Sequence, residues 1–241
     1  MKFIERIIEK QKDNFENKPA TIAFLGDSVT QGCFELYVKK DGNLETYFDK
    51  NCAYHNYLAK IFAVLYPSVP VNIINAGISG DSAPHAAKRV ERDVLSYNPD
   101  LVVVCFGLND VNLGVDGLDQ YKEALDNIFT KLEENGTEYI FMTPNMMNTE
   151  VSCHLDTELF KGIAENTMKL QNGGVMDMYM DAAREVCKKH NAPVCDCYKK
   201  WKTLEKCGAD TTELLANKIN HPLREMNWLF AYSLAETIFE L

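Results

Sequence analysis

Short apolar runs alternate with longer charged segments along this chain, and this alternation constrains the fold more than any other feature. The apolar runs, rich in β-branched and aromatic residues, are residues 20–25, 71–75, 101–106, 139–143 and 193–197. Segments with helical periodicity lie between them, at residues 54–66, 82–97, 119–135, 175–190 and 222–241. Such alternation predicts an α/β fold, in which helices cover both faces of a parallel sheet. The run 101–106 is the most apolar, which predicts the middle of the sheet.

The size and composition indicate one globular domain over residues 1–241. Of these residues, 46% are hydrophobic and 25% are charged, close to the averages of globular proteins. No apolar run reaches the ~18 residues of a membrane span, and the formal charge of −10 argues against nucleic-acid and anionic-lipid partners. The spacing of Ile4, Ile7, Ile8 and Phe15 predicts an amphipathic helix over residues 1–17 that packs on the domain. No interface signature is present, so a homo-oligomer is left open.

The cysteines and the N-terminal segment predict a cytoplasmic protein. The eight cysteines include no CxxC pair, which disfavours zinc-ribbon and thioredoxin-type sites. Reduced thiols of a cytosolic protein explain this pattern best. Residues 1–17 are charged throughout and lack the apolar run of a signal peptide.

Two polar segments are long for connections in an α/β domain. Residues 36–52 follow the first predicted strand, and residues 145–174 follow the fourth. Loops of this length in a compact fold are usually functional or mobile. We expect both to start at the carboxyl edge of the sheet, where open α/β sheets bind ligands.

Polar, glycine-containing turns follow each of the first three predicted strands. They are Gly26-Asp27-Ser28, Asn75-Ala76-Gly77 and Gly107-Leu108-Asn109-Asp110. In a doubly wound sheet with strand order 2-1-3-4-5, the three strand ends are neighbours at the switch point. The turns would then bring one hydroxyl, one glycine N–H and one carboxamide to the same crevice.

This set of groups suits acyl transfer. Ser28 is the candidate nucleophile, and the backbone N–H groups of Ser28 and Gly77, with the Asn109 side chain, are candidate oxyanion-hole donors. A serine hydroxyl needs a base, and His221 is the best placed of the five histidines. Pro222 keeps His221 out of the helical region and predicts that the final helix starts there, with its dipole favouring a neutral imidazole.

These four blocks resemble the SGNH hydrolases, also called GDSL-type esterases and lipases. The family is named for the serine, glycine, asparagine and histidine that correspond here to Ser28, Gly77, Asn109 and His221, and the resemblance runs in order from residue 22 to residue 222. It implies a flavodoxin-like, three-layer α/β/α fold with a five-stranded parallel sheet. It also implies ester hydrolysis through an acyl-serine intermediate, with no metal or cofactor.

One position departs from the family pattern. Members usually carry an aspartate three residues before the histidine, where it orients the imidazole, and Lys218 stands there in this chain. An ammonium cannot accept the imidazole N–H, so the orienting group is Asn217, a backbone carbonyl or an acid from elsewhere. Asp27 and Asp110 are predicted to support the site by bonding loop amides.

A second GDS tripeptide, Gly80-Asp81-Ser82, offers an alternative nucleophile. Because Ser82 begins a segment with helical periodicity, a helix N-cap is the simpler interpretation.

The leading functional expectation is hydrolysis of short acyl esters, particularly O-acetyl groups on carbohydrate, as small-molecule substrates. Lysophospholipase or acyl-thioester hydrolysis is the alternative among enzymes. A flavodoxin-like module that binds a flavin phosphate through GDSVTQG, and a catalytically silent family member, are the alternatives from other classes.

Overall fold

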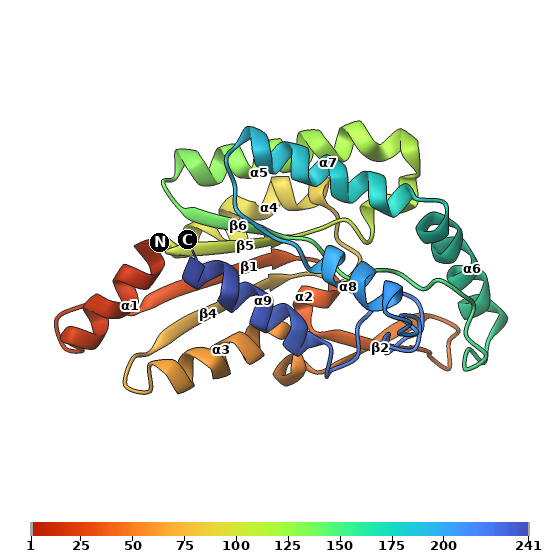
Figure 1. Cartoon of the computed structure of the whole chain (residues 1–241), viewed down its shortest axis with the longest axis horizontal. Coiled ribbons are helices and arrows are strands. Elements are labelled where there is room, and N and C mark those ends of the chain that lie inside the picture. The colour runs from red at the N-terminus through yellow and green to blue at the C-terminus, as the bar shows by residue number, and fades with distance from the viewer. Residues whose placement is uncertain (1, 241) are drawn as a thin grey trace.

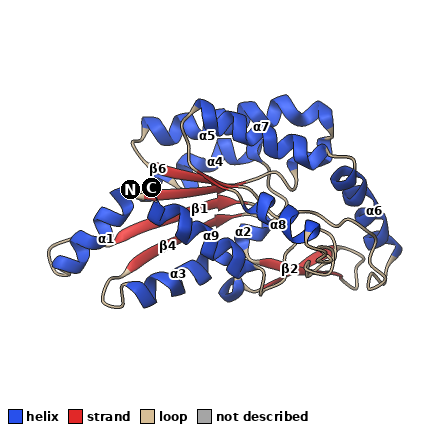
Figure 2. Ribbon diagram, viewed as in Figure 1, coloured by secondary structure: helices blue, strands red, loops and turns tan. Residues whose placement is uncertain are grey.

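The computed structural model describes residues 2–240, and a five-stranded parallel sheet forms its centre (Figures 1 and 2). The strand order is β4-β1-β5-β6-β7, which is 2-1-3-4-5 when these five strands are numbered along the chain. The predicted sheet and its order are therefore confirmed. The strand bounds are β1 Ala20–Gly26, β4 Val71–Gly77, β5 Leu101–Cys105, β6 Glu138–Met142 and β7 Val194–Cys195.

Helices cover both faces of the sheet, which gives the three layers that the family resemblance implies. In Figure 1, α3 (Tyr54–Leu65) and α9 (Asn227–Glu240) lie on one face, and α4 (Ala83–Asp93), α5 (Leu118–Glu134) and α7 (Val175–Lys189) lie on the other. The remaining helices are α1 Lys2–Lys12, α2 Ser28–Gln31, α6 Glu158–Asn172 and α8 Cys197–Lys206. Short 3₁₀ turns are formed by Lys50–Cys52, Leu95–Tyr97, Asp110–Leu113 and Val115–Gly117.

The core is centred on β5, whose five residues are all buried. Its neighbours β1 and β6 are almost as deeply buried, because each is covered by helices on both faces. The apolar run at 101–106 thus lies in the middle of the sheet, as its composition predicts.

The N-terminal helix is shorter than the sequence pattern suggests. Helix α1 ends at Lys12, and its buried side chains Phe3 and Ile7 pack on the domain, with the Phe3 ring centroid 5.7 Å from that of Phe62. Phe15 is 97% exposed rather than on the packed face. The Asp13 carboxylate accepts the N–H groups of Phe15 and Glu16, and this local turn competes with continuation of the helix.

The two segments predicted as long loops contain regular structure. Residues 36–48 are part of an antiparallel hairpin of β2 (Cys33–Val38) and β3 (Leu44–Phe48). Residues 145–174 contain α6, which begins at the Thr157 N-cap. The buried face of α6 includes Thr167 and Gln171, which bond to Asn148 and Tyr198. Because these buried side chains are polar, apolar periodicity alone does not reveal the helix.

The last helix also starts later than predicted. Helix α9 begins at Asn227 rather than Pro222; Pro222 forms an isolated antiparallel bridge with Leu215, and residues 224–226 form a turn. Helix α8, which the sequence pattern did not reveal, begins after the Asp196 N-cap and buries Trp201.

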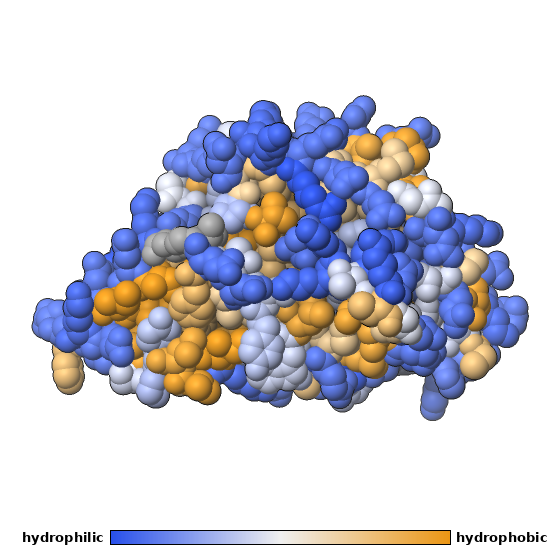
Figure 3. Space-filling view, in the orientation of Figure 1, coloured by the Kyte–Doolittle hydropathy of each residue, from blue (hydrophilic) through white to orange (hydrophobic). Residues whose placement is uncertain are grey.

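Apolar side chains reach the surface on one helix layer. Figure 3 shows apolar atoms gathered over α3 and α9, where Ile61, Leu65, Leu229, Tyr232 and Phe239 line a shallow groove. Among residues 2–240, no helix is both long and apolar enough to cross a lipid bilayer.

Candidate active site

The carboxyl ends of three neighbouring strands bring the predicted site segments together. In the sheet register Gly26 of β1 lies beside Gly77 of β4 on one side and Cys105 of β5 on the other. Ser28 follows Gly26 by two residues, and Asn109 follows Cys105 by four. The serine, glycine and asparagine therefore meet at one edge of the sheet.

Ser28 is held at the start of a one-turn helix. The Asp27 carboxylate accepts the Val29 N–H at 3.0 Å and caps α2, so Ser28 is the first helical residue. Gly32, with φ of 96°, ends this turn in a left-handed conformation that favours glycine. Gly77 packs directly on the same turn, because a Cβ at position 77 would lie 2.3 Å from the Gln31 nitrogen.

His221 meets Ser28 from the other end of the sequence. Its Nε2 lies 2.9 Å from Ser28 Oγ, and both residues are buried. Its Nδ1 lies 2.8 Å from the backbone oxygen of Phe34 at the start of β2. A carbonyl oxygen can only accept, so Nδ1 carries the proton and the Nε2 lone pair faces the serine hydroxyl. This is the tautomer that a general base requires.

Burial keeps the imidazole neutral. Removal from water lowers the pKa of His221 from 6.5 to about 4, while the Phe34 carbonyl and the charge of Glu35 oppose the shift. The dipole of the final helix does not account for this, because α9 begins six residues beyond His221. Desolvation is the physical cause instead.

The loop before His221 is fixed by Asn217, which does not touch the ring. Asn217 Oδ1 accepts the backbone N–H groups of Ile219, Asn220 and His221 at 2.9–3.0 Å. Lys218, at φ of 56°, directs its ammonium to Glu213, with Nζ 2.7 Å from Oε2. Of the three orienting groups left open by the sequence, the geometry selects a backbone carbonyl, that of Phe34.

The β2–β3 hairpin and the segment 145–174 both contact the segment that carries His221. The hairpin supplies the Phe34 carbonyl, and the segment 145–174 supports the loop of His221 from behind. Asn145 donates to the Asn220 carbonyl at 2.8 Å, and the Asn148 N–H donates to the Ile219 carbonyl at 2.8 Å. Both asparagines are fully buried, and the sequence analysis missed them.

Two of the three candidate oxyanion donors, Gly77 and Asn109, already donate hydrogen bonds within the protein. The Gly77 N–H donates to Asn75 Oδ1 at 3.0 Å, and Asn109 Nδ2 donates to the Asp81 carbonyl at 2.8 Å. A carboxamide has a second hydrogen to offer, whereas a backbone amide has one. The Asn75 side chain must therefore rotate away from the Gly77 N–H, or share that hydrogen with the substrate, before Gly77 can bind an oxyanion.

Buried carboxyl groups surround these turns. Asp110 Oδ1 accepts the Ala83 N–H at 2.9 Å and so caps α4, a role that Ser82 fills by position but not by its side chain. Burial raises the pKa of Asp27 from 3.8 to about 7 and that of Asp110 to about 6. Asp27 bonds the amide that follows Ser28, whereas Asp110 bonds the first amide of α4.

Arg89 is a structural part of the site that the sequence analysis missed. It is buried on α4 and donates to the Ala76 carbonyl at 2.7 Å and the Gly26 carbonyl at 3.1 Å, at the ends of β4 and β1. It also forms a two-pronged ion pair with Asp81, the residue whose carbonyl holds Asn109. In the sequence, the signal was only an arginine between the apolar residues Ala86 and Val90 of a segment with helical periodicity.

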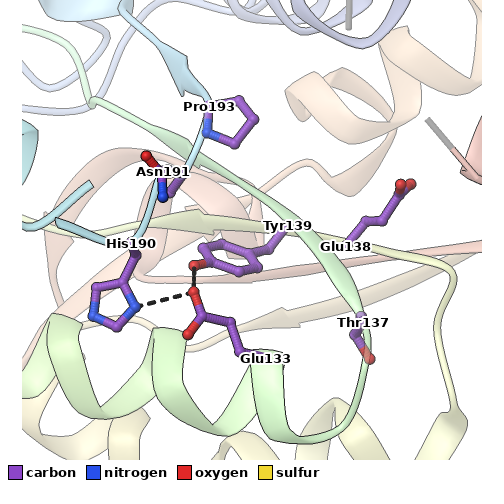
Figure 4. A pocket seen from close by; sticks show the side chains of 8 residues that line it. Glu133, Thr137, Glu138, Tyr139, His190, Asn191 and Pro193 are labelled. Atoms are coloured by element: carbon purple, nitrogen blue, oxygen red, sulfur yellow. Dashed lines mark hydrogen bonds and ion pairs between the residues drawn. The ribbon is translucent and has the colours of Figure 1, made fainter. Parts of the chain in front are cut away.

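A cavity of about 350 Å³ lies far from these residues, at the opposite edge of the sheet. It is lined by residues around the amino ends of β6 and β7, including Glu133, Tyr139, His190 and Pro193 (Figure 4). His190 contacts Glu133 through Nδ1 at 3.0 Å and Asp126 through Nε2 at 2.8 Å. Because both ring nitrogens are engaged by carboxylates, His190 ties α5 to the end of α7.

Comparison with known proteins agrees with this fold. The model of the GDSL-like lipase/acylhydrolase family matches residues 24–229. An acetylxylan esterase from Geobacillus stearothermophilus is 27% identical over 132 residues, which cover 51% of this chain and 58% of the relative. This chain therefore matches less than two thirds of that relative's length.

Solved structures show the same fold at low sequence identity. A two-domain esterase active on acetylated mannans superposes with a TM-score of 0.67 at 17% identity, over 99% of this chain and 52% of that one. A catalytic mutant of an acetylxylan esterase from Geobacillus stearothermophilus superposes with a TM-score of 0.66 at 20% identity, over 92% of this chain and 95% of that one.

The match over most of the chain assigns it to a family of carboxylic-ester hydrolases. The chain belongs to the GDSL-like lipase/acylhydrolase family, and the resemblance noted from the sequence motifs is confirmed.

Proposed function

We propose that this protein hydrolyses short acyl esters, chiefly acetyl groups on carbohydrate, through an acyl-serine intermediate. The observation that carries the proposal is the contact of 2.9 Å between Ser28 Oγ and His221 Nε2, with the histidine tautomer set by the Phe34 carbonyl. Nucleophile and base lie within hydrogen-bond distance, as this mechanism requires.

The reaction follows from these positions. Ser28 Oγ bonds to the ester carbonyl carbon while its proton passes to His221 Nε2. The tetrahedral oxyanion takes hydrogen bonds from the N–H groups of Ser28 and Gly77 and from Asn109. The bond to the alcohol then breaks, and His221 returns the proton to the leaving oxygen. Water attacks the acyl-serine by the same sequence of transfers, which releases the acid and restores Ser28.

Two observations support a polar, acetylated substrate over a lipid. The named relatives include an acetylxylan esterase and an esterase active on acetylated mannans. Beside the His221 loop, a cavity of about 250 Å³ is lined by Glu35, His154, Asp156 and Lys218, together with apolar residues such as Leu36, Leu155 and Phe160. The charged part of this lining suits hydroxyl-bearing substrates better than long acyl chains.

The test is hydrolysis of nitrophenyl esters of increasing chain length, together with acetate release from acetylated xylo-oligosaccharides. We expect the highest kcat/KM on the acetyl ester and no activity in Ser28→Ala. Ser82→Ala, in the second GDS tripeptide, is the matched control and should behave as wild type. A maximum at C8 or longer would favour the lysophospholipase or acyl-thioesterase alternative, and inactivity on every ester would favour a catalytically silent protein.

Cytoplasmic location stays a prediction from the cysteine pattern. Within residues 2–240, all eight cysteines are free thiols, which is typical of a reducing compartment.

A further inference from the structure

The carbonyl that orients His221 lies at an irregular point of the β2–β3 hairpin. The strand pairing shifts register between Cys33 and Leu36, so Phe34 and Glu35 have no directly opposed partner on β3. A bulge of this kind leaves the local backbone without its regular ladder contacts. Something other than the hairpin ladder must therefore hold the Phe34 oxygen against His221 Nδ1.

Arg224 contacts this irregular segment and lies in the same loop region as His221. It follows His221 by three residues, and its Nη1 and Nη2 lie 2.6 and 3.0 Å from the two carboxylate oxygens of Glu35. Its guanidinium carbon lies 4.3 Å from the centroid of the Phe34 ring. Arg224 thus contacts both Phe34, whose carbonyl binds His221, and the next residue, Glu35.

A third contact connects Arg224 to the nucleophile's helix. Its Nε donates to Asp49 Oδ2 at 3.1 Å, and the Asp49 N–H donates at 2.8 Å to the carbonyl of Gly32, the residue that ends α2. The Arg224 guanidinium lowers the pKa of both Glu35 and Asp49, so both carboxylates remain ionised and bound to it. One side chain therefore joins the segments that carry His221, Phe34 and Ser28.

We propose that Arg224 is a positioning residue that, through Glu35 and the Phe34 ring, holds the Phe34 carbonyl against His221 Nδ1, in place of the aspartate usual in this family. The inference rests on the proposed function, since it assigns a role in preparing His221 as a base. Arginine suits this role because its planar fork matches a carboxylate and its face stacks on an aromatic ring.

Loss of the Arg224 guanidinium has a defined consequence. Without Arg224, Glu35 and the Phe34 ring lose their common partner, and the Phe34 oxygen moves relative to Nδ1. His221 is then free to carry its proton on Nε2, where it cannot accept the serine proton. A displacement of about 1 Å in such a site costs up to about 10²-fold in rate.

The experiment compares Arg224→Met and Arg224→Lys with Arg184→Met in the full chain. Arg184 is the matched control, because it forms a similar two-pronged ion pair with Asp196 at 3.0 and 3.1 Å but lies on α7, on the other side of the sheet from α9. Measured quantities are kcat and KM on nitrophenyl acetate, the melting temperature, and the tautomer of His221 by ¹⁵N NMR, with the signal assigned from His221→Gln.

We expect Arg224→Met to lower kcat by about 10- to 100-fold with KM within about twofold, and to shift His221 toward the Nε2–H tautomer. Arg224→Lys keeps the charge and should lose less, about three- to tenfold. Arg184→Met should change the melting temperature by a similar amount without changing kcat or the tautomer.

The inference is overturned if both Arg224 variants keep the wild-type kcat and the Nδ1–H tautomer, or if Arg184→Met loses as much activity as Arg224→Met. Failure of the proposed function is a separate result, namely a wild type that hydrolyses no ester. The NMR comparison still reports in that case whether Arg224 sets the tautomer of His221.

Discussion

His221 Nδ1 donates to the backbone carbonyl oxygen of Phe34 at 2.8 Å, although 187 residues separate the two in sequence. A neutral carbonyl selects the same tautomer as the aspartate usual in the family. It does not add the negative charge that would stabilise an imidazolium. The group that orients His221 beside Ser28 is therefore part of the main chain.

Asn217→Asp should leave kcat within a few-fold of wild type, since the three N–H groups that it holds need only an oxygen acceptor. Asn217→Ala removes that acceptor and should lower kcat at least about tenfold, because the His221 loop loses its internal support. Steady-state kinetics of both variants test this. A large gain in Asn217→Asp would show instead that a missing carboxylate limits the enzyme.

The pH dependence of kcat/KM should reflect the buried histidine. With the pKa of His221 near 4, the base is neutral throughout the range above pH 5, so activity falls only as pH drops toward 4. The contribution of His221 to folding stability also decreases as pH falls. The unfolded histidine binds its proton near pH 6.5, so this contribution to stability is full above pH 6.5 and is lost as pH falls toward 4. A decrease of kcat/KM already between pH 7 and pH 6 would contradict the lowered pKa of His221.

Asp27→Asn should stabilise the protein increasingly as pH rises. Since burial raises the pKa of Asp27 from 3.8 to about 7, the folded state binds the extra proton within that window, and wild type loses stability from pH 4 to 7. Asparagine keeps the acceptor for Val29 and has no charge to bury. The difference in melting temperature between variant and wild type should grow by at least about 3 °C between pH 5 and 8. A constant difference would contradict a raised pKa.

Arg89→Met should cost about 3–5 kcal/mol of unfolding free energy, because it leaves Asp81 buried and unpaired. Arg92→Met is the matched control on the same helix. The Arg92 side chain is 74% exposed and pairs with Asp93, so its loss should change stability by less than about 0.5 kcal/mol. Urea denaturation of both variants measures their unfolding free energies. An equal loss in the two variants would show that Arg89 contributes no more than a surface ion pair.

The fold was predictable because the apolar runs that form β1, β5 and β6 are buried under helices on both faces and carry a clear signal. Helix α6 escaped because Thr167 and Gln171 occupy its buried face with satisfied hydrogen bonds. The Phe34 contact could not be assigned to a residue from sequence, since every residue has a carbonyl. Only the folded hairpin determines which one faces His221.

The measurement that tests the central claim most directly is intact-mass spectrometry after treatment with a fluorophosphonate. Wild type and Ser82→Ala should each gain one phosphonyl group, with loss of fluoride. Ser28→Ala should gain none, and His221→Ala should react at least about 10³-fold more slowly. Absence of an adduct on folded wild type, or an adduct that persists in Ser28→Ala, would contradict a working Ser28–His221 pair.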